Sequence, residues 1–64
     1  MVTDIYDLKI GDKFKDISGI YIVVGFRYSE TFGYRVVQAK EDSGILYEFG
    51  YDYPPDAPVI VKIT

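Results

Sequence analysis

The chemistry available to this chain is limited by two residue types that it lacks. It contains no Cys and no His. This excludes Cys nucleophiles, Ser-His and Cys-His catalytic pairs, disulfides, and metal sites built from thiolate or imidazole. Any acid–base or hard-cation site would have to use carboxylates or tyrosines. We therefore expect a protein without enzymatic activity and without a cofactor.

Carboxylates are the first remaining candidates. Asp4, Asp7 and Asp12 lie near the start of the chain, and Glu41 and Asp42 lie together at a predicted turn. None of them has the spacing of an EF-hand loop. Isolated acidic residues at turns usually face solvent or accept hydrogen bonds from backbone amides. The six glycines are scattered along the chain, so neither a metal site nor a phosphate-binding loop is expected.

Aromatic side chains are the most unusual feature of the composition. Seven Tyr and four Phe make up 17% of the 64 residues, so some must be partly exposed in so small a domain. Tyr combines a large contact surface with a hydroxyl group and is enriched at protein interfaces. Tyr28 and Tyr34 flank a loop whose Phe32 either packs back on the domain or projects as an anchor. Three phenylalanines are expected in the core: Phe14, Phe26 and Phe49.

The elements that position these side chains are predicted to be strands. Val and Ile together supply 15 residues and Leu only two, a composition that suits pleated, half-buried surfaces. With 48% hydrophobic residues, we expect one small folded domain, residues 1–64. The segment from Thr3 to Leu8 is either one helical turn capped by Thr3 or an irregular lead-in. Turn signals separate five predicted strands: residues 12–15, 20–28, 34–41, 45–51 and 59–63.

The order and lengths of these strands resemble a known architecture. The strand 20–28 is long and contains Gly25, which allows a bulge or sharp bend. Five short strands, a bent second strand, a three-strand meander and a Pro-containing connection resemble an SH3-like small β-barrel. The segment 8–14, with Gly11 followed by Asp12, resembles the entry to the first strand in Tudor-type and KOW-type barrels. The expected fold is an all-β, five-stranded, strongly bent antiparallel SH3-like small barrel.

The register between strands decides which side chains face the core, because a slip by one residue moves every side chain to the opposite face. We expect Tyr28 to pair with Tyr34 across a five-residue loop, and a two-residue turn at residues 43–44. A three-residue loop would place Glu48 and Asp52 on the core face, at the cost of burying charge. The preferred register gathers one core face: Ile22, Val24, Phe26, Val36, Phe49 and Tyr51.

The opposite face of the same strands is predicted to be a smooth apolar strip. Its middle row has little side-chain relief: Gly25, Val37 and Gly50. Arg27 and Arg35 lie opposite one another at one end of this strip, and two facing arginines repel unless an anion lies between them. Either Asp52 bridges the arginines and nothing binds here, or the arginine pair holds one end of a partner-binding surface.

A second candidate site is the segment that contains Tyr51, Asp52 and Tyr53 before Pro54 and Pro55. It resembles the aromatic and acidic elements that line the peptide groove of SH3 domains. Tudor-like barrels hold methylated lysine or arginine in an aromatic cage with an acid, and these residue types suit such cation–π contact. In the alternative interpretation, the prolines only end one edge strand and precede the next.

The charge balance favours a protein partner. Seven Lys and Arg against ten Asp and Glu give a net charge of −3, which disfavours binding driven by phosphate neutralisation. We predict a non-catalytic protein-binding module that acts as a small regulator or inhibitor. Compact proteins of this size are common among phage and mobile-element products, so such an origin is a further expectation. The predicted partner-binding residues are Arg27, Tyr28, Phe32, Tyr34, Arg35, Val37 and Tyr53.

Single-stranded nucleic-acid binding is the alternative function. Exposed tyrosines would stack on bases while Arg27, Arg35, Lys40 and Lys62 contact phosphates. No apolar run approaches the roughly 18 residues of a membrane span, and the first residues lack the pattern of a signal peptide. We expect a cytoplasmic protein that does not bind membranes, with which the absence of Cys is compatible.

Overall fold

The computed structural model describes residues 2–63, whose strands all pair in antiparallel fashion. The strands are β1 (Val2–Thr3), β2 (Lys13–Asp16), β3 (Gly19–Ser29), β4 (Tyr34–Glu41), β5 (Leu46–Phe49) and β6 (Ile60–Ile63). Two 3-10 turns lie on the connections, η1 (Ile5–Asp7) and η2 (Pro54–Asp56), and residues 2–63 contain no α-helix. The prediction of an all-β fold is confirmed.

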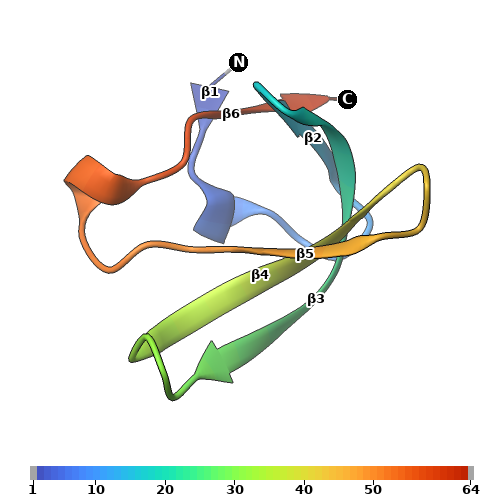
Figure 1. Cartoon of the computed structure of the whole chain (residues 1–64). Helices are drawn as coiled ribbons and strands as arrows, with labels where there is room; N and C mark the ends of the chain where they lie inside the picture. Colours follow the sequence, from blue (N-terminus) through green and yellow to red (C-terminus); the bar gives the residue numbers. More distant parts are fainter. Residues whose placement is uncertain (1, 64) are drawn as a thin grey trace.

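The strands form one bent sheet in the order β1-β6-β2-β3-β4-β5. Figure 1 shows β3 curving strongly. The strand β2 pairs with the first part of β3, and β4 pairs alongside β3 from Tyr21 to Ser29. Within residues 2–63 no backbone pairing joins β5 to β1, so the sheet is open between these two edges. The prediction of five strands was one too few. The additional strand is β1, which pairs with β6 through Val2 and Val61.

The bend in β3 coincides with a β-bulge. Val23 pairs with Ala39 and Gly25 pairs with Gln38, so Val24 has no partner of its own on β4. The bulge predicted at Gly25 is therefore confirmed to within one residue. A bulge turns the following side chains to the opposite face because it adds one residue to only one strand. Val24 is 41% exposed, so its predicted place in the core is wrong.

The hairpin loops correct the predicted register on both sides of β4. Ser29 pairs with Tyr34, which leaves a loop of four residues rather than five, and the Gly33 backbone has φ 78°. On the other side, the backbone N–H of Glu41 donates to the carbonyl of Ile45 at 3.2 Å, which leaves three loop residues rather than two. Gly44 has φ 88° there, as three-residue hairpin loops require at their last position.

Because of these two shifts, the side chains of β4 point to the opposite faces of the sheet from those predicted. Val37 pairs with Phe26 on one side and with Phe49 on the other. Val37 and Ala39 are both fully buried in the core cluster, so the predicted place of Val37 on the outer strip is wrong. Glu48 pairs with Gln38 on the opposite side of the sheet. The three-residue loop therefore buries no charge among the core side chains.

The core face is the side of β3, β4 and β5 that carries Val23, Phe26, Val37, Ala39 and Phe49, and the outer face is the opposite side. Phe14, at the centre, is fully buried, as predicted. Its ring lies 5.5 Å from that of Tyr21 and 5.1 Å from that of Phe49. Phe26, Phe49 and Tyr51 are half-buried and pack against this core. Its buried members are Ile5, Leu8, Phe14, Tyr21, Val23, Val37, Ala39 and Ile60.

Val36 was also predicted on the core face, and this placement is wrong. It pairs with Arg27 and so belongs to the outer face, where it is nevertheless buried. Ile22 pairs with Lys40 on that face as well and is half-buried. Each of these side chains has an apolar neighbour one residue away that takes the predicted place in the core.

Candidate protein-binding surface

The predicted binding residues lie at the end of the β3–β4 hairpin, but on its two different faces. Arg35 pairs with Tyr28, whereas Arg27 pairs with Val36. Paired residues of antiparallel strands share a face, and the next pair points to the opposite face. The two arginine side chains therefore lie on opposite faces of the sheet. The predicted arginine pair on one surface is therefore wrong.

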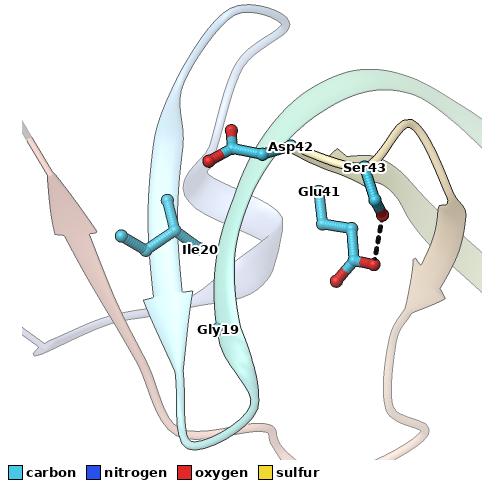
Figure 2. Close-up of a pocket in the computed structure, with 5 residues that line it drawn as sticks. All are labelled: Gly19, Ile20, Glu41, Asp42 and Ser43. Carbon is cyan, nitrogen blue, oxygen red and sulfur yellow. Dashed lines mark hydrogen bonds between the residues drawn. The ribbon is translucent and has the colours of Figure 1, made fainter.

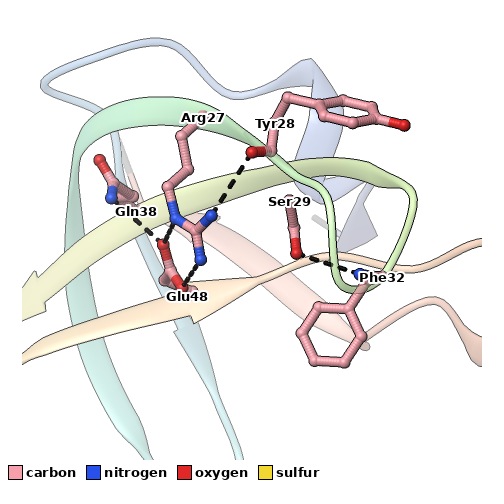
Figure 3. Close-up of polar contacts among 6 residues, drawn as sticks. All are labelled: Arg27, Tyr28, Ser29, Phe32, Gln38 and Glu48. Atoms are coloured by element: carbon pink, nitrogen blue, oxygen red, sulfur yellow. Dashed lines mark hydrogen bonds and ion pairs between the residues drawn. The ribbon is translucent and has the colours of Figure 1, made fainter.

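On the outer face, Arg27 is neutralised by Glu48 (Figure 3). Two guanidinium nitrogens bind the two carboxylate oxygens, with Nη2 donating to Oε1 at 2.6 Å and Nε bound to Oε2. Gln38 donates to the same carboxylate at 3.2 Å. The hydrogen bond raises the pKa of Arg27 and lowers the pKa of Glu48. Bidentate pairing uses the donor fork with which arginine would otherwise bind a partner.

Tyr34, which pairs with Ser29, lies on the same outer side as Arg27 and stacks with Phe32 of the loop. The rings of Phe32 and Tyr34 are stacked at 5.5 Å, and Phe32 remains 62% exposed. The hydroxyl of Ser29 accepts a hydrogen bond from the Phe32 backbone at 3.2 Å, which fixes this loop. Figure 3 shows the rings of Tyr28 and Phe32 directed away from one another. The exposed rings of Phe32 and Tyr28 therefore point in different directions and do not form one contact surface.

On the core-face side, the guanidinium of Arg35 lies over two aromatic rings. Its central carbon is 5.4 Å from the ring centre of Tyr6 and 5.4 Å from that of Phe26. Cation–π contacts of this kind hold a guanidinium without using its N–H donors. No carboxylate of residues 2–63 forms an ion pair with Arg35. Asp52 does not bridge the arginines within residues 2–63, so this one of the two predicted alternatives is wrong.

Tyr6 replaces a missing pair of the β4–β5 ladder. That ladder ends at Val37 and Phe49, and in the same register Val36 would next pair with Gly50 and then Arg35 with Tyr51. The Tyr6 hydroxyl lies between them, donating to the Arg35 carbonyl at 2.6 Å and accepting from the Tyr51 N–H at 3.0 Å. A Cβ atom on Gly50 would lie 3.0 Å from this hydroxyl and 2.9 Å from a Tyr34 ring carbon. Only glycine fits at this crossing without displacement.

Asp4 connects Tyr6 and Tyr51 to the start of the chain. One oxygen accepts from the Tyr6 backbone N–H at 2.9 Å and caps η1, and the other accepts from the Tyr51 hydroxyl at 2.5 Å. The bond from Tyr51 is the main cause that lowers the pKa of Asp4, and the same bond raises the pKa of Tyr51 to about 12. The predicted helical turn is thus a 3-10 turn capped by Asp4, not by Thr3.

Two other predicted site residues change their roles. Val37 is fully buried, so it cannot contact a partner at the surface. Tyr51 does not form a cage with Tyr53, because its ring packs at 4.9 Å against Tyr6 and its hydroxyl is bound to Asp4. Tyr53 is 55% exposed in the segment before η2. It remains accessible to a partner.

Two shallow pockets lie away from this hairpin end. Figure 2 shows the first, where the β2–β3 turn approaches the β4–β5 loop. Its polar side chains come from Glu41, Asp42 and Ser43, and the Ser43 hydroxyl donates to Glu41. The second pocket is lined by residues that include Ile17, Pro58 and Val59. Neither pocket contains a basic residue or any residue of the predicted site.

Residues 2–63 contain no group of three or more acidic side chains arranged to hold a metal ion. They also contain no helix long and apolar enough to cross a membrane.

The contribution of the first residues to the site was not predicted from the sequence. Tyr6 was counted among the aromatics without a role, and Asp4 was considered only as one of several carboxylates. Both are now central to the surroundings of Arg35. The available signal was Gly50 between two aromatic residues, which marks a close approach by another group.

Comparison with protein-family models, curated proteins and solved structures found no match for this chain.

Proposed function

We propose that this protein is a non-catalytic protein-binding module and acts as a small regulator or inhibitor. The observation that carries the proposal is the pairing of Arg35, whose guanidinium has no acidic partner within residues 2–63, with the 63% exposed Tyr28. Exposed Tyr and Arg on a rigid scaffold are the side chains that contribute most to protein interfaces. Arg27 is left out of this surface because Glu48 occupies its donors.

The proposed surface continues from the core-face side of the hairpin end to its loop. Tyr28 and Arg35 form its centre. The exposed Phe32 of the loop and the exposed Tyr53 before η2, together with Tyr34, are proposed as further contact residues outside this centre. The proposal includes an SH3-like barrel as the scaffold, which the bent β3 and the 3-10 turn before β6 support. It also includes a cytoplasmic location, which suits a chain without Cys. A phage or mobile-element origin fits the small size.

The test uses the tagged protein as bait in a host-cell lysate, with and without nuclease treatment. The affinity of each recovered protein is then measured for the wild type and for Tyr28→Ala and Arg35→Glu. We expect a nuclease-resistant partner whose affinity falls at least about tenfold in both variants. Unchanged affinity in variants that remain folded by circular dichroism would place the site elsewhere. Failure to recover any protein partner would contradict the function.

Single-stranded nucleic-acid binding remains the second candidate because of the stacked pair formed by Phe32 and Tyr34. An exposed ring of this kind could stack on a base. If the wild type binds a thymidine oligonucleotide and affinity falls steeply as salt rises, this alternative replaces the first. The net charge of −3 argues against that result.

A further inference from the structure

The side-chain donors of Arg35 bind no acceptor among residues 2–63. A guanidinium carries five N–H donors in a planar fork. Between residues 2 and 63, the basic side chains that form ion pairs are Arg27, with Glu48, and Lys62, with Asp12. The Arg35 side chain also makes no hydrogen bond to any described residue, although its backbone carbonyl accepts one from Tyr6. Its fork is therefore available to a ligand.

The surroundings of Arg35 are fixed before any ligand arrives. Tyr6 is held at its backbone by Asp4 and at its hydroxyl by two backbone groups, so its ring cannot move freely under the guanidinium. Phe26 is half-buried against the core and supplies the second ring. A side chain that is already held in place loses less conformational entropy when it binds. Arg35 is thus better prepared for binding than an ordinary exposed arginine.

An exposed apolar surface lies directly beside this fork. Tyr28 is the cross-strand partner of Arg35 and is 63% exposed. Directly paired side chains on one face of an antiparallel sheet lie about 4.5–5.5 Å apart at their Cβ atoms. A ligand bound by the fork would therefore reach the Tyr28 ring with an adjoining apolar group.

We infer that Arg35, supported by Tyr6 and Phe26 and flanked by Tyr28, binds a carboxylate that adjoins an aromatic or aliphatic group on the partner protein. This inference rests on the proposed protein-binding function and names the chemistry that its surface recognises. An acidic side chain or a chain-terminal carboxylate next to an apolar side chain has the required form. The planar fork matches the two oxygens of a carboxylate.

Charge around the site favours a single carboxylate over a phosphate backbone. Asp4 and Asp7 lie on the segment that carries Tyr6, and Asp52 follows Tyr51. Nucleic-acid backbones are bound by several cations along a track. Arg35 has acidic residues on the adjoining segments instead. One guanidinium can neutralise one carboxylate under these conditions, whereas a polyphosphate would be repelled.

The test uses two probes that differ only in the carboxylate: N-acetyl-phenylalanine and N-acetyl-phenylalaninamide. Each is titrated into the folded, full-length protein while backbone amide and aromatic ring resonances are followed by NMR. We expect saturable shifts at Arg35, Tyr28 and Phe26 with the acid. The amide should bind at least about tenfold more weakly, as expected for loss of a charge-assisted bidentate pair. Equal binding of the two probes would overturn the inference.

Variants and a phosphate control locate the site. Arg35→Gln should weaken binding of N-acetyl-phenylalanine at least about tenfold, and Arg35→Lys should weaken it less because it keeps the charge but loses the fork. Arg27→Gln, which removes the same charge from the other face, should change affinity less than about twofold because Arg27 is occupied by Glu48. An equal loss in Arg27→Gln, or tighter binding of inorganic phosphate than of the acid, would overturn the assignment. If Arg35→Gln does not fold, the wild-type probe pair still decides.

The two proposals can fail separately. A recovered partner protein whose affinity does not respond to Arg35→Gln, together with equal binding of the two probes, would reject the carboxylate site and leave the protein-binding function in place. Specific binding of N-acetyl-phenylalanine without any recovered protein partner would support the site and reject the proposed function.

Discussion

Two arginines of one hairpin have different side-chain partners in this structure. Arg27 on β3 and Arg35 on β4 are both exposed and lie near the same loop. Arg27 faces the outer side and binds both oxygens of Glu48, whereas Arg35 lies over Tyr6 and Phe26 with no acidic partner within residues 2–63. Exposure and charge are therefore not enough to identify a binding arginine. The face on which it lies decides whether its donors are already used.

The difference between the two sides follows from what packs against each. On the outer face, the strand β5 brings Glu48 within reach of Arg27. On the core-face side, the segment before β2 brings an aromatic residue, Tyr6, under Arg35. An aromatic ring supports a cation without neutralising its hydrogen-bond donors. A supported but unneutralised cation is suited to bind an external anion.

The largest expected effect comes from removing the core that both arginine environments share. Phe14→Ala should lower the free energy of unfolding by about 3–5 kcal/mol, because Phe14 is fully buried and its ring contacts Tyr21 and Phe49. That loss approaches the whole stability of a small domain, so the variant should be largely unfolded. Urea denaturation followed by circular dichroism measures this. A cooperative transition near the wild-type midpoint would show that the core is misassigned.

A second variant should disturb the point where the two environments meet. Gly50→Ala adds a methyl group 2.9 Å from a Tyr34 ring carbon, 3.0 Å from the Tyr6 hydroxyl and 3.1 Å from the Arg35 carbonyl. We expect a loss of about 1–3 kcal/mol in the free energy of unfolding from this crowding. Asp52→Ala, two residues away and exposed, is the control and should change stability by less than about 0.5 kcal/mol. Equal stability of the two variants would contradict the close approach.

A third variant should affect only the Arg35 side. Tyr6→Phe keeps the ring under the guanidinium but removes the hydroxyl that binds the Arg35 carbonyl and the Tyr51 N–H. We expect a loss of about 1–2 kcal/mol in the free energy of unfolding. Tyr34→Phe removes a hydroxyl with no hydrogen bond to residues 2–63 and should cost less than about 0.5 kcal/mol. Urea denaturation of both variants tests this, and the reverse order would refute the role of Tyr6.

The titration of Tyr51 offers a further test of the same cluster. The bond to Asp4 raises the pKa of Tyr51 to about 12 from an ordinary value of 10.0. Since the folded state holds this proton more tightly, the stabilisation is complete below pH 10 and is lost as pH rises through 12. Asp4→Asn should lower the pKa of Tyr51, whereas Asp52→Asn should leave it unchanged. The ring-carbon chemical shift of Tyr51 reports this pKa, and an unchanged value in Asp4→Asn would disprove the bond.

Much of the fold was predictable from composition and turn signals. Strand 34–41 was predicted with its observed bounds, and Phe14 was correctly placed in the core. The register was not predictable by the same means because Val23 and Val24 are adjacent, as are Val36 and Val37. Either member of each pair can face the core with similar apolar area. The bulge at Val24 and the lengths of two loops decide between them, and alternation alone does not reveal these features.

The candidate site was predictable only in part, for the same reason. The sequence marked Tyr28 and Arg35 as candidate binding residues, but the assumed register placed Arg27 beside Arg35 and Val37 at the surface. The pairing of Arg27 with Glu48 follows from the correct register of β5. The position of Tyr6 under Arg35 depends on how the first residues pack, for which the sequence offers no periodic pattern. Long-range packing therefore decided which arginine is free.

The most direct test of the central claim compares both arginines in one wild-type sample. The side-chain Nε–H resonances of Arg27 and Arg35 are assigned, and N-acetyl-phenylalanine is added stepwise. The account predicts that the Arg35 resonance moves and saturates while the Arg27 resonance, held by Glu48, stays in place. Movement of the Arg27 resonance alone, or equal movement of both, would contradict the conclusion that only Arg35 is available to a partner's carboxylate.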